Sequence, residues 1–194
     1  MQSPAQSLIE LLTKLKEMKS HDTSALSDLH NVENLKAKLS AVDYEQRLSA
    51  LKSHNLLGTV LSTLAAGGHL ELLKCIIDFI KECNRFEVYK LTDDGHRTLI
   101  HCAAYHHHFK VIDLVLRSLS SPEEQLELLL IKNTARRTAL DYSVRENALN
   151  ESVCDVMFRQ LTAPQRQQLI DASQTYQQFI VNREMSEQTG LPCM

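Results

Sequence analysis

Hydrophobic residues recur at helical spacing along most of the chain, beginning near the N-terminus. A capping-box pattern of Ser3 with Gln6, with Pro4 at the first helical position, predicts a helix over residues 3–19. Its apolar face consists of Leu8, Leu11, Leu12 and Leu15. After a polar, turn-like segment at residues 20–24, a second helical pattern carries Leu26, Leu29, Val32, Leu35 and Leu39. We interpret residues 1–42 as an N-terminal helical cap or a degenerate repeat.

Farther along, one arrangement of apolar and small residues occurs three times, in residues 59–74, 98–116 and 138–147. Each stretch begins with a threonine, and Thr59, Thr98 and Thr138 are 39 and 40 residues apart. Self-similarity at such a spacing is typical of repeat proteins, in which each unit buries its apolar face against its neighbours. The sequence therefore predicts a protein built from repeated units.

The middle stretch resembles the ankyrin repeat, whose core reads T-P-L-H-x-A-A-x-x-G-H-x-E-V-V-x-x-L-L. Residues 98–116 align with this core without gaps, and Ala103 and Ala104 supply its small pair. The resemblance implies an all-α, ankyrin-like helical solenoid with short hairpin loops and helical caps at both ends. It also implies that the three threonines cap the first helix of each unit. The turn between the two helices would hold Gly68, His107 and Asn147, residue types that tolerate positive φ.

The sequence departs from the family pattern at the hairpins. The proline after threonine is absent, and the glycine two residues before threonine is replaced by Leu57, His96 and Arg136. We therefore expect altered or shortened hairpin fingers, with residues 55–58 the least typical.

A second periodicity predicts an extra helix in each unit. Residues 43–55 align with residues 121–133, and both begin with a capping residue followed three positions later by Gln46 or Glu124. A shorter counterpart begins at residue 84, and a fourth helix of this kind begins at residue 162, after the last repeat. One added helix per unit explains a period near 40 rather than the family's usual 33.

These patterns divide the chain into six parts. Residues 43–83, 84–120 and 121–161 are the three repeats, and they follow the N-terminal part over residues 1–42. Residues 162–184 form a C-terminal capping helix, running roughly from Pro164 to Arg183, and residues 185–194 form a frayed tail with Gly190 and Pro192.

Composition narrows the class of protein. The net charge is only −3 and the basic residues are dispersed, so we expect no nucleic acid as partner. Apolar runs fall far short of a membrane span, and the N-terminus lacks the pattern of a signal peptide. The five cysteines are odd in number and form no C-x-x-C pair, which favours reduced core thiols in an intracellular protein. We expect a cytoplasmic location, which includes that of an effector translocated into a host cytosol.

The histidine-rich middle repeat is the candidate location for a catalytic or metal site. Cys102 and His106 are four residues apart and could share one helix face as metal ligands. In the family, however, the positions of His101 and His108 are structural, His107 stands at the turn, and no zinc-type spacing exists. Cys102 lies just before the small pair, so a structural thiol is favoured over a nucleophile. We expect no catalytic residue, no metal and no cofactor.

The resemblance leaves a binding surface as the functional feature. In the family, partners contact hairpin tips and the exposed side of the first helices. Tyrosine and arginine dominate energetic hot spots, and the arginines would favour a partner with carboxylates. The positions carried over by alignment are Asp94, Arg97, Tyr105, His106, Thr134, Arg137, Arg145 and Glu146.

We therefore expect a monomeric, non-enzymatic module that binds a protein or peptide through hairpin tips and the concave face. Two alternatives remain open at this point. One is an effector or regulator that inhibits a target enzyme by occlusion. The other is a metal-dependent protein or enzyme that uses the histidine-rich middle repeat.

Overall fold

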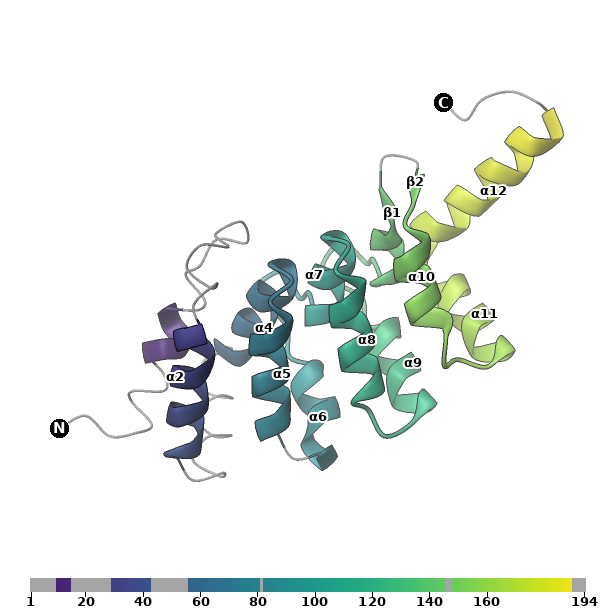
Figure 1. Cartoon of the computed structure of the whole chain (residues 1–194). Coiled ribbons are helices and arrows are strands. Elements are labelled where there is room, and N and C mark those ends of the chain that lie inside the picture. The colour runs from purple at the N-terminus through teal and green to yellow at the C-terminus, as the bar shows by residue number, and fades with distance from the viewer. Residues whose placement is uncertain (1–9, 15–28, 43–55, 81, 146–147, 190–194) are drawn as a thin grey trace.

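A computed structural model describes residues 10–14, 29–42, 56–80, 82–145 and 148–189. Figure 1 shows their helices side by side in an elongated stack that runs from the N-terminal to the C-terminal part. Buried apolar side chains from Leu12 to Tyr176 form one hydrophobic cluster through this stack. The predicted helical solenoid is confirmed.

The first helices of the repeats form the inner row. They are α4 (Leu56–Ala66), α7 (Leu99–Tyr105) and the 3₁₀ helix η2 (Leu140–Ser143), with α7 packed between the other two. Ala103 and Ala104 are completely buried. Their small side chains allow the close approach of neighbouring helices that the repeat pattern predicts.

The second helices form an outer row. They are α5 (Leu70–Phe79), α8 (Phe109–Arg117) and α10 (Glu151–Phe158), and α2 (Leu29–Ser40) packs against α5. Gly68 and His107 have φ values of 70° and 62° in the turns between first and second helices, as the sequence predicts. Asn147, the third predicted turn residue, lies outside the described residues.

Three further helices form a third row and confirm the predicted extra helices. They are α6 (Glu82–Tyr89), α9 (Pro122–Leu130) and α11 (Ala163–Ala172), and α9 contacts both of the others. The side chain of Ser121 caps α9 by accepting the Glu124 N–H, and Thr162 forms a capping box with Gln165 at α11. The corresponding helix predicted over residues 43–55 lies outside the part of the chain that the structure describes.

Polar contacts join this third row to the outer one. The Tyr89 hydroxyl lies 2.7 Å from the Ser118 hydroxyl, and Gln125 donates to the Leu116 carbonyl at 2.9 Å. Both contacts occupy the C-terminal end of α8, where helical carbonyl groups lack partners within the helix. The extra helices therefore satisfy backbone groups as well as covering apolar surface.

The capping position predicted for the three threonines is correct for Thr98, lies one residue before the N-cap Ala139 of η2 for Thr138, and is wrong for Thr59. Thr98 caps α7 in a capping box with His101, and Thr138 makes the same reciprocal contacts with Asp141. Thr59, however, lies inside α4, because that helix begins three residues earlier, at Leu56. Of residues 55–58, expected to be the least typical hairpin, residues 56–58 are described and belong to α4, where Leu57 and Gly58 are buried.

The last repeat differs from the predicted helix pair. Its first helix is the short η2, followed by a hairpin of β1 (Val144–Arg145) and β2 (Ala148–Leu149), in which Val144 pairs with Leu149. The Ser143 hydroxyl donates to the Leu140 carbonyl, and the Ser143 carbonyl accepts the Asn150 N–H at 2.8 Å. These bonds turn the backbone away from the helical path. The sequence differs at the same place, because Ser143 and the β-branched Val144 replace the two alanines of the middle repeat.

The predicted C-terminal helix over residues 164–183 is two helices, α11 and α12 (Gln174–Thr189). They separate at Ser173, whose hydroxyl donates to the Leu169 carbonyl at 2.7 Å and lies 2.6 Å from the Thr138 hydroxyl. Residues 185–189, predicted to be frayed, belong to α12. Of the N-terminal helix predicted over residues 3–19, residues 10–14 are described and are helical.

Candidate functional site

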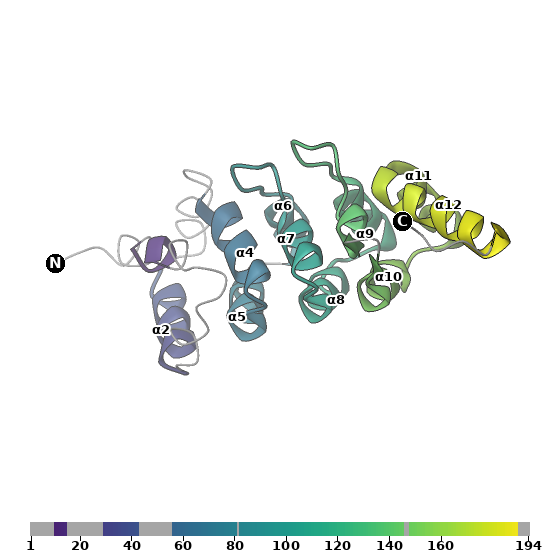
Figure 2. The same cartoon turned by 90° about the horizontal axis from the view of Figure 1, so that it is seen from above.

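Two finger loops, residues 91–98 and 131–138, project from the solenoid on the side opposite to α5, α8 and α10 (Figure 2). In the first finger, the Asp93 carboxylate accepts the N–H groups of Gly95 and Arg97, both at 2.9 Å. His96 occupies the left-handed region with φ of 55°. A carboxylate that bonds to the backbone two and four residues onward therefore builds this turn.

The second finger is built in the same way from Asn133. Its side-chain oxygen accepts the N–H groups of Ala135 at 2.9 Å and Arg137 at 3.1 Å, and Arg136 has φ of 60°. The sequence interpretation did not single out Asp93 or Asn133. The signal was available, because an Asp or Asn stands five residues before threonine in both repeats.

The fingers are joined directly. Thr134 donates to the Gly95 carbonyl from its backbone N–H at 3.3 Å and from its hydroxyl at 3.2 Å. Thr134, predicted to contact a partner, therefore joins the two fingers.

A hollow of about 600 Å³, here called the inner groove, lies between the fingers and the helices α4 and α7. Its lining includes five of the eight predicted partner-binding residues: Asp94, Arg97, Tyr105, His106 and Arg137. Thr134 is not part of the lining. Arg145 belongs to β1 rather than to a first helix, and its side chain and Glu146 lie outside the described parts.

Aromatic rings form one wall of the inner groove. Tyr105 is 42% exposed, and its ring meets those of His106 and Tyr142 edge to face, with centroids 5.0 and 5.6 Å apart. Asn133 donates to the Tyr142 hydroxyl at 2.7 Å, and the Arg137 guanidinium lies 6.0 Å from the Tyr142 ring centroid. Tyr142 is a lining residue that the sequence interpretation missed.

The charges of the inner groove are nearly balanced. Arg97 is held by Asp93 through contacts of 2.8 Å, and this hydrogen bonding raises the pKa of Arg97. Arg137 forms no ion pair with the described residues, whereas Asp94 adds an exposed negative charge. The expected preference for an acidic partner therefore depends on Arg137 and not on Arg97.

Residues 61–116, from the middle of α4 to near the end of α8, match the family model of ankyrin repeats (many copies). This part of the chain is similar to ankyrin repeats. Such repeats generally serve as protein–protein interaction modules. No curated protein and no solved structure matches the chain significantly. The family match ends before the last repeat, in which the hairpin replaces part of the first helix.

His101 and His108, at the histidine positions of the repeat pattern, make hydrogen bonds that stabilise the fold. The Thr98 N–H donates to His101 Nδ1 at 3.2 Å, so Nε2 carries the proton and donates to the Arg137 carbonyl at 3.2 Å. His108 Nε2 donates to the Ala66 carbonyl of the preceding repeat at 3.0 Å. Burial lowers the pKa of His101, which keeps it neutral and linked to the second finger.

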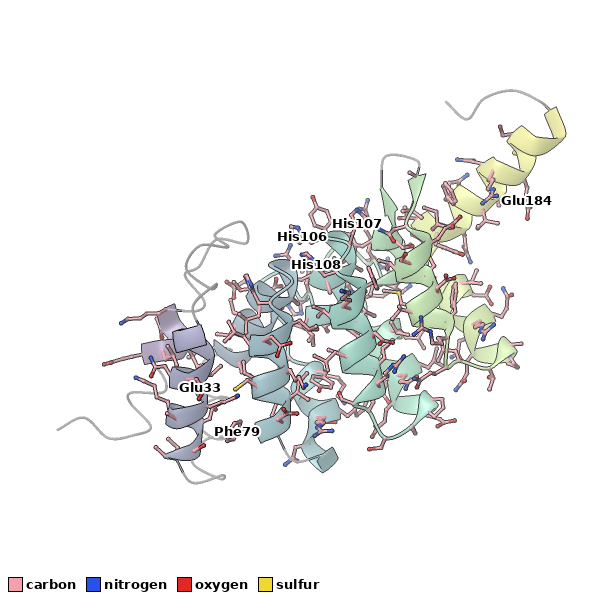
Figure 3. All side chains as sticks on the ribbon, in the orientation of Figure 1. Glu33, Phe79, His106, His107, His108 and Glu184 are labelled. Carbon is pink, nitrogen blue, oxygen red and sulfur yellow. The ribbon has the colours of Figure 1, made fainter. Side chains whose placement is uncertain are left out.

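The environment of Cys102 in the middle repeat favours a structural role over a catalytic one. Burial raises the pKa of the Cys102 thiol to about 11, so the thiol stays protonated and is a weak nucleophile near neutral pH. Figure 3 shows His106, His107 and His108 at the turn between α7 and α8. Within the described parts of the chain, no three His, Cys, Asp or Glu side chains come close enough together to hold a metal ion.

No helix among the described residues is both long and apolar enough to cross a membrane.

Proposed function

We propose that this protein is a non-enzymatic binding module whose inner groove holds a segment of a partner protein. The observation that carries the proposal is the inner groove itself. It gathers five alignment-derived binding positions around a hollow of about 600 Å³, a volume within the usual range for binding sites. Its exposed aromatic Tyr105 and its cation Arg137, which forms no ion pair with a described residue, belong to the residue types that most often anchor partners.

The construction of the fingers supports recognition by a rigid surface. Asp93 and Asn133 hold the two turns, the Thr134 bonds hold one finger to the other, and His101 holds the second finger to α7. A partner segment would thus meet side chains that are already positioned, so little conformational entropy is lost on binding. We infer that the partner presents an apolar or aromatic residue to Tyr105 and a carboxylate to Arg137.

The reduced cysteines support an intracellular location for this module. Cys75, Cys102 and Cys154 are buried free thiols. Thiols persist where the compartment is reducing. We propose the cytoplasm as the place where the partner is met.

A displayed library of random peptides, selected against the wild-type protein, tests the inner groove. Tyr105→Ala and Arg137→Glu should each weaken the selected peptides about tenfold or more, because each removes one anchor. Arg97 is left unchanged, since a substitution there would also break the Asp93 contacts of the finger.

Lys132→Glu is the matched control for Arg137→Glu, because Lys132 is exposed in the same finger and does not line the inner groove. Val181→Ala is the control for Tyr105→Ala, since Val181 is exposed on α12 and lines neither this hollow nor the other one on the surface. Peptides that bind all four variants like wild type would refute the inner groove as the binding site.

A further inference from the structure

A second hollow, here called the outer groove, has a volume of about 400 Å³ and lies between the second helices α5, α8 and α10. None of its lining residues lines the inner groove. The outer row stands on the side opposite to the two fingers (Figure 2). Occupancy of one groove therefore leaves the other open.

The floor of the outer groove is apolar. Leu70 begins α5, Phe109 begins α8, and Leu114 and Val156 complete the surface between the helices. Phe109 is 39% exposed, although an aromatic ring gains free energy from burial. An exposed aromatic residue inside a hollow with apolar neighbours marks a place where a partner side chain can be buried.

The rim of the outer groove is predominantly basic, with four cationic and two anionic side chains. Asp113 accepts from Arg117 at 3.0 Å and from Arg159 at 3.1 Å, so its charge is already neutralised. Lys74 and Lys110 are exposed and form no ion pair with any described residue, and Glu71 is the remaining anion. The outer groove therefore carries an excess of positive charge that the inner groove lacks.

We propose that the outer groove binds a short acidic segment of a partner protein. One large apolar side chain of this segment packs against Phe109 between Leu70 and Leu114, and carboxylates on either side of it face Lys74 and Lys110. Opposite charge at the rim with an apolar floor is the complement of such a segment.

The dimensions of the outer groove limit the segment to a few residues. The lining along α8 extends from Phe109 to Arg117, eight residues apart, or about 12 Å at the rise of a helix. That length corresponds to about two turns of a bound helix or about four residues of an extended strand. A lipid surface is the less suitable occupant, because the basic residues surround a hollow rather than a flat face.

Fluorescent peptide pools test the proposal on the full chain. Each peptide has about twelve residues with a central phenylalanine or leucine, flanked by random aspartate, glutamate and serine in one pool and by lysine, arginine and serine in the other. We expect the acidic pool to bind and the basic pool not to bind. Binding should weaken as salt is raised, because the lysines are exposed.

Two variants locate the binding. Lys74→Glu with Lys110→Glu, and separately Phe109→Ala, should each weaken the acidic peptides about tenfold or more. All three positions are exposed, so the fold should be retained, which circular dichroism verifies. The matched control is Lys14→Glu with Lys132→Glu, which makes the same change in net charge at exposed positions elsewhere.

The proposal is supported if both outer-groove variants lose binding while the matched control and Tyr105→Ala retain it. It is overturned if no acidic peptide binds at about 1 mM, or if the basic pool binds equally well. It is also overturned if the matched control loses as much affinity as the lysine pair. Binding to anionic lipid vesicles that depends on the lysines, without binding of acidic peptides, would overturn it in favour of a membrane surface.

Discussion

The carboxylate of Asp141 accepts the backbone N–H of Thr175 at 2.7 Å, across 34 residues of sequence. The same oxygen accepts the Tyr176 N–H at 3.2 Å, while the other oxygen accepts the Thr138 N–H at 2.8 Å. Asp141 thus caps two helical segments at once, at the start of η2 and at the start of α12. In the middle repeat the corresponding residue, His101, bonds to the next finger instead.

Asp141→Ala should lower the free energy of unfolding by about 3 kcal/mol, because it leaves buried donors at both caps without an acceptor. Asp141→Asn should cost less, since its one side-chain oxygen can still accept at one of the two caps. Urea unfolding followed by circular dichroism measures both. Asp155→Ala is the control, because Asp155 is exposed on α10. A cost for Asp141→Ala no larger than that of the control would contradict its role as a double cap.

Stability should fall as the pH is lowered from about 6.5, partly through His101. Burial holds the pKa of His101 below its ordinary value, so the unfolded chain binds the proton more readily than the native protein does. The stability that neutral His101 contributes is therefore complete above about pH 6.5 and is lost as the pH falls toward its lowered pKa. Melting temperatures measured between about pH 7.5 and 5.5 should show this decline.

His101→Gln isolates that contribution. Glutamine at this position can still accept the Thr98 N–H in a capping box, but it does not titrate. The variant should show a shallower decline. A slope should remain from His69, whose pKa is lowered by burial and by the nearby His108. An unchanged slope in His101→Gln would show that His101 does not contribute to the pH dependence.

Arg136→Gly should stabilise the protein slightly, by about 0.5 kcal/mol. Arg136 has φ of 60°, and a side chain in this left-handed region destabilises the native state by about 1 kcal/mol or more, whereas glycine is unstrained there. Glycine also raises the conformational entropy of the unfolded chain, which offsets part of this gain. Arg136→Ala should bring no such gain, because it keeps the Cβ atom. Equal urea midpoints for the glycine and alanine variants would show that the turn carries no strain of this kind.

The sequence predicted those elements whose determinants lie within a few residues of one another. Ser121 with Glu124 caps α9, Thr98 with His101 caps α7, and Gly68 and His107 adopt their left-handed turns as expected. The fingers keep their turns although His96 and Arg136 replace glycine, because Asp93 and Asn133 bond to the backbone nearby. The domain boundaries and the assignment of partner-binding residues remain predictions.

What the sequence determined by itself is the repeated helical unit, its extra helix and its left-handed turns, because caps, turns and apolar periodicity act within one or two helical turns. Only the tertiary structure decided the break at Ser173, the hairpin in the last repeat and the outer groove. The break is stabilised by Thr138 and Asp141, more than 30 residues away, and the outer groove combines side chains from three separate repeats. Such features depend on contacts between units, which a single repeat's sequence does not specify.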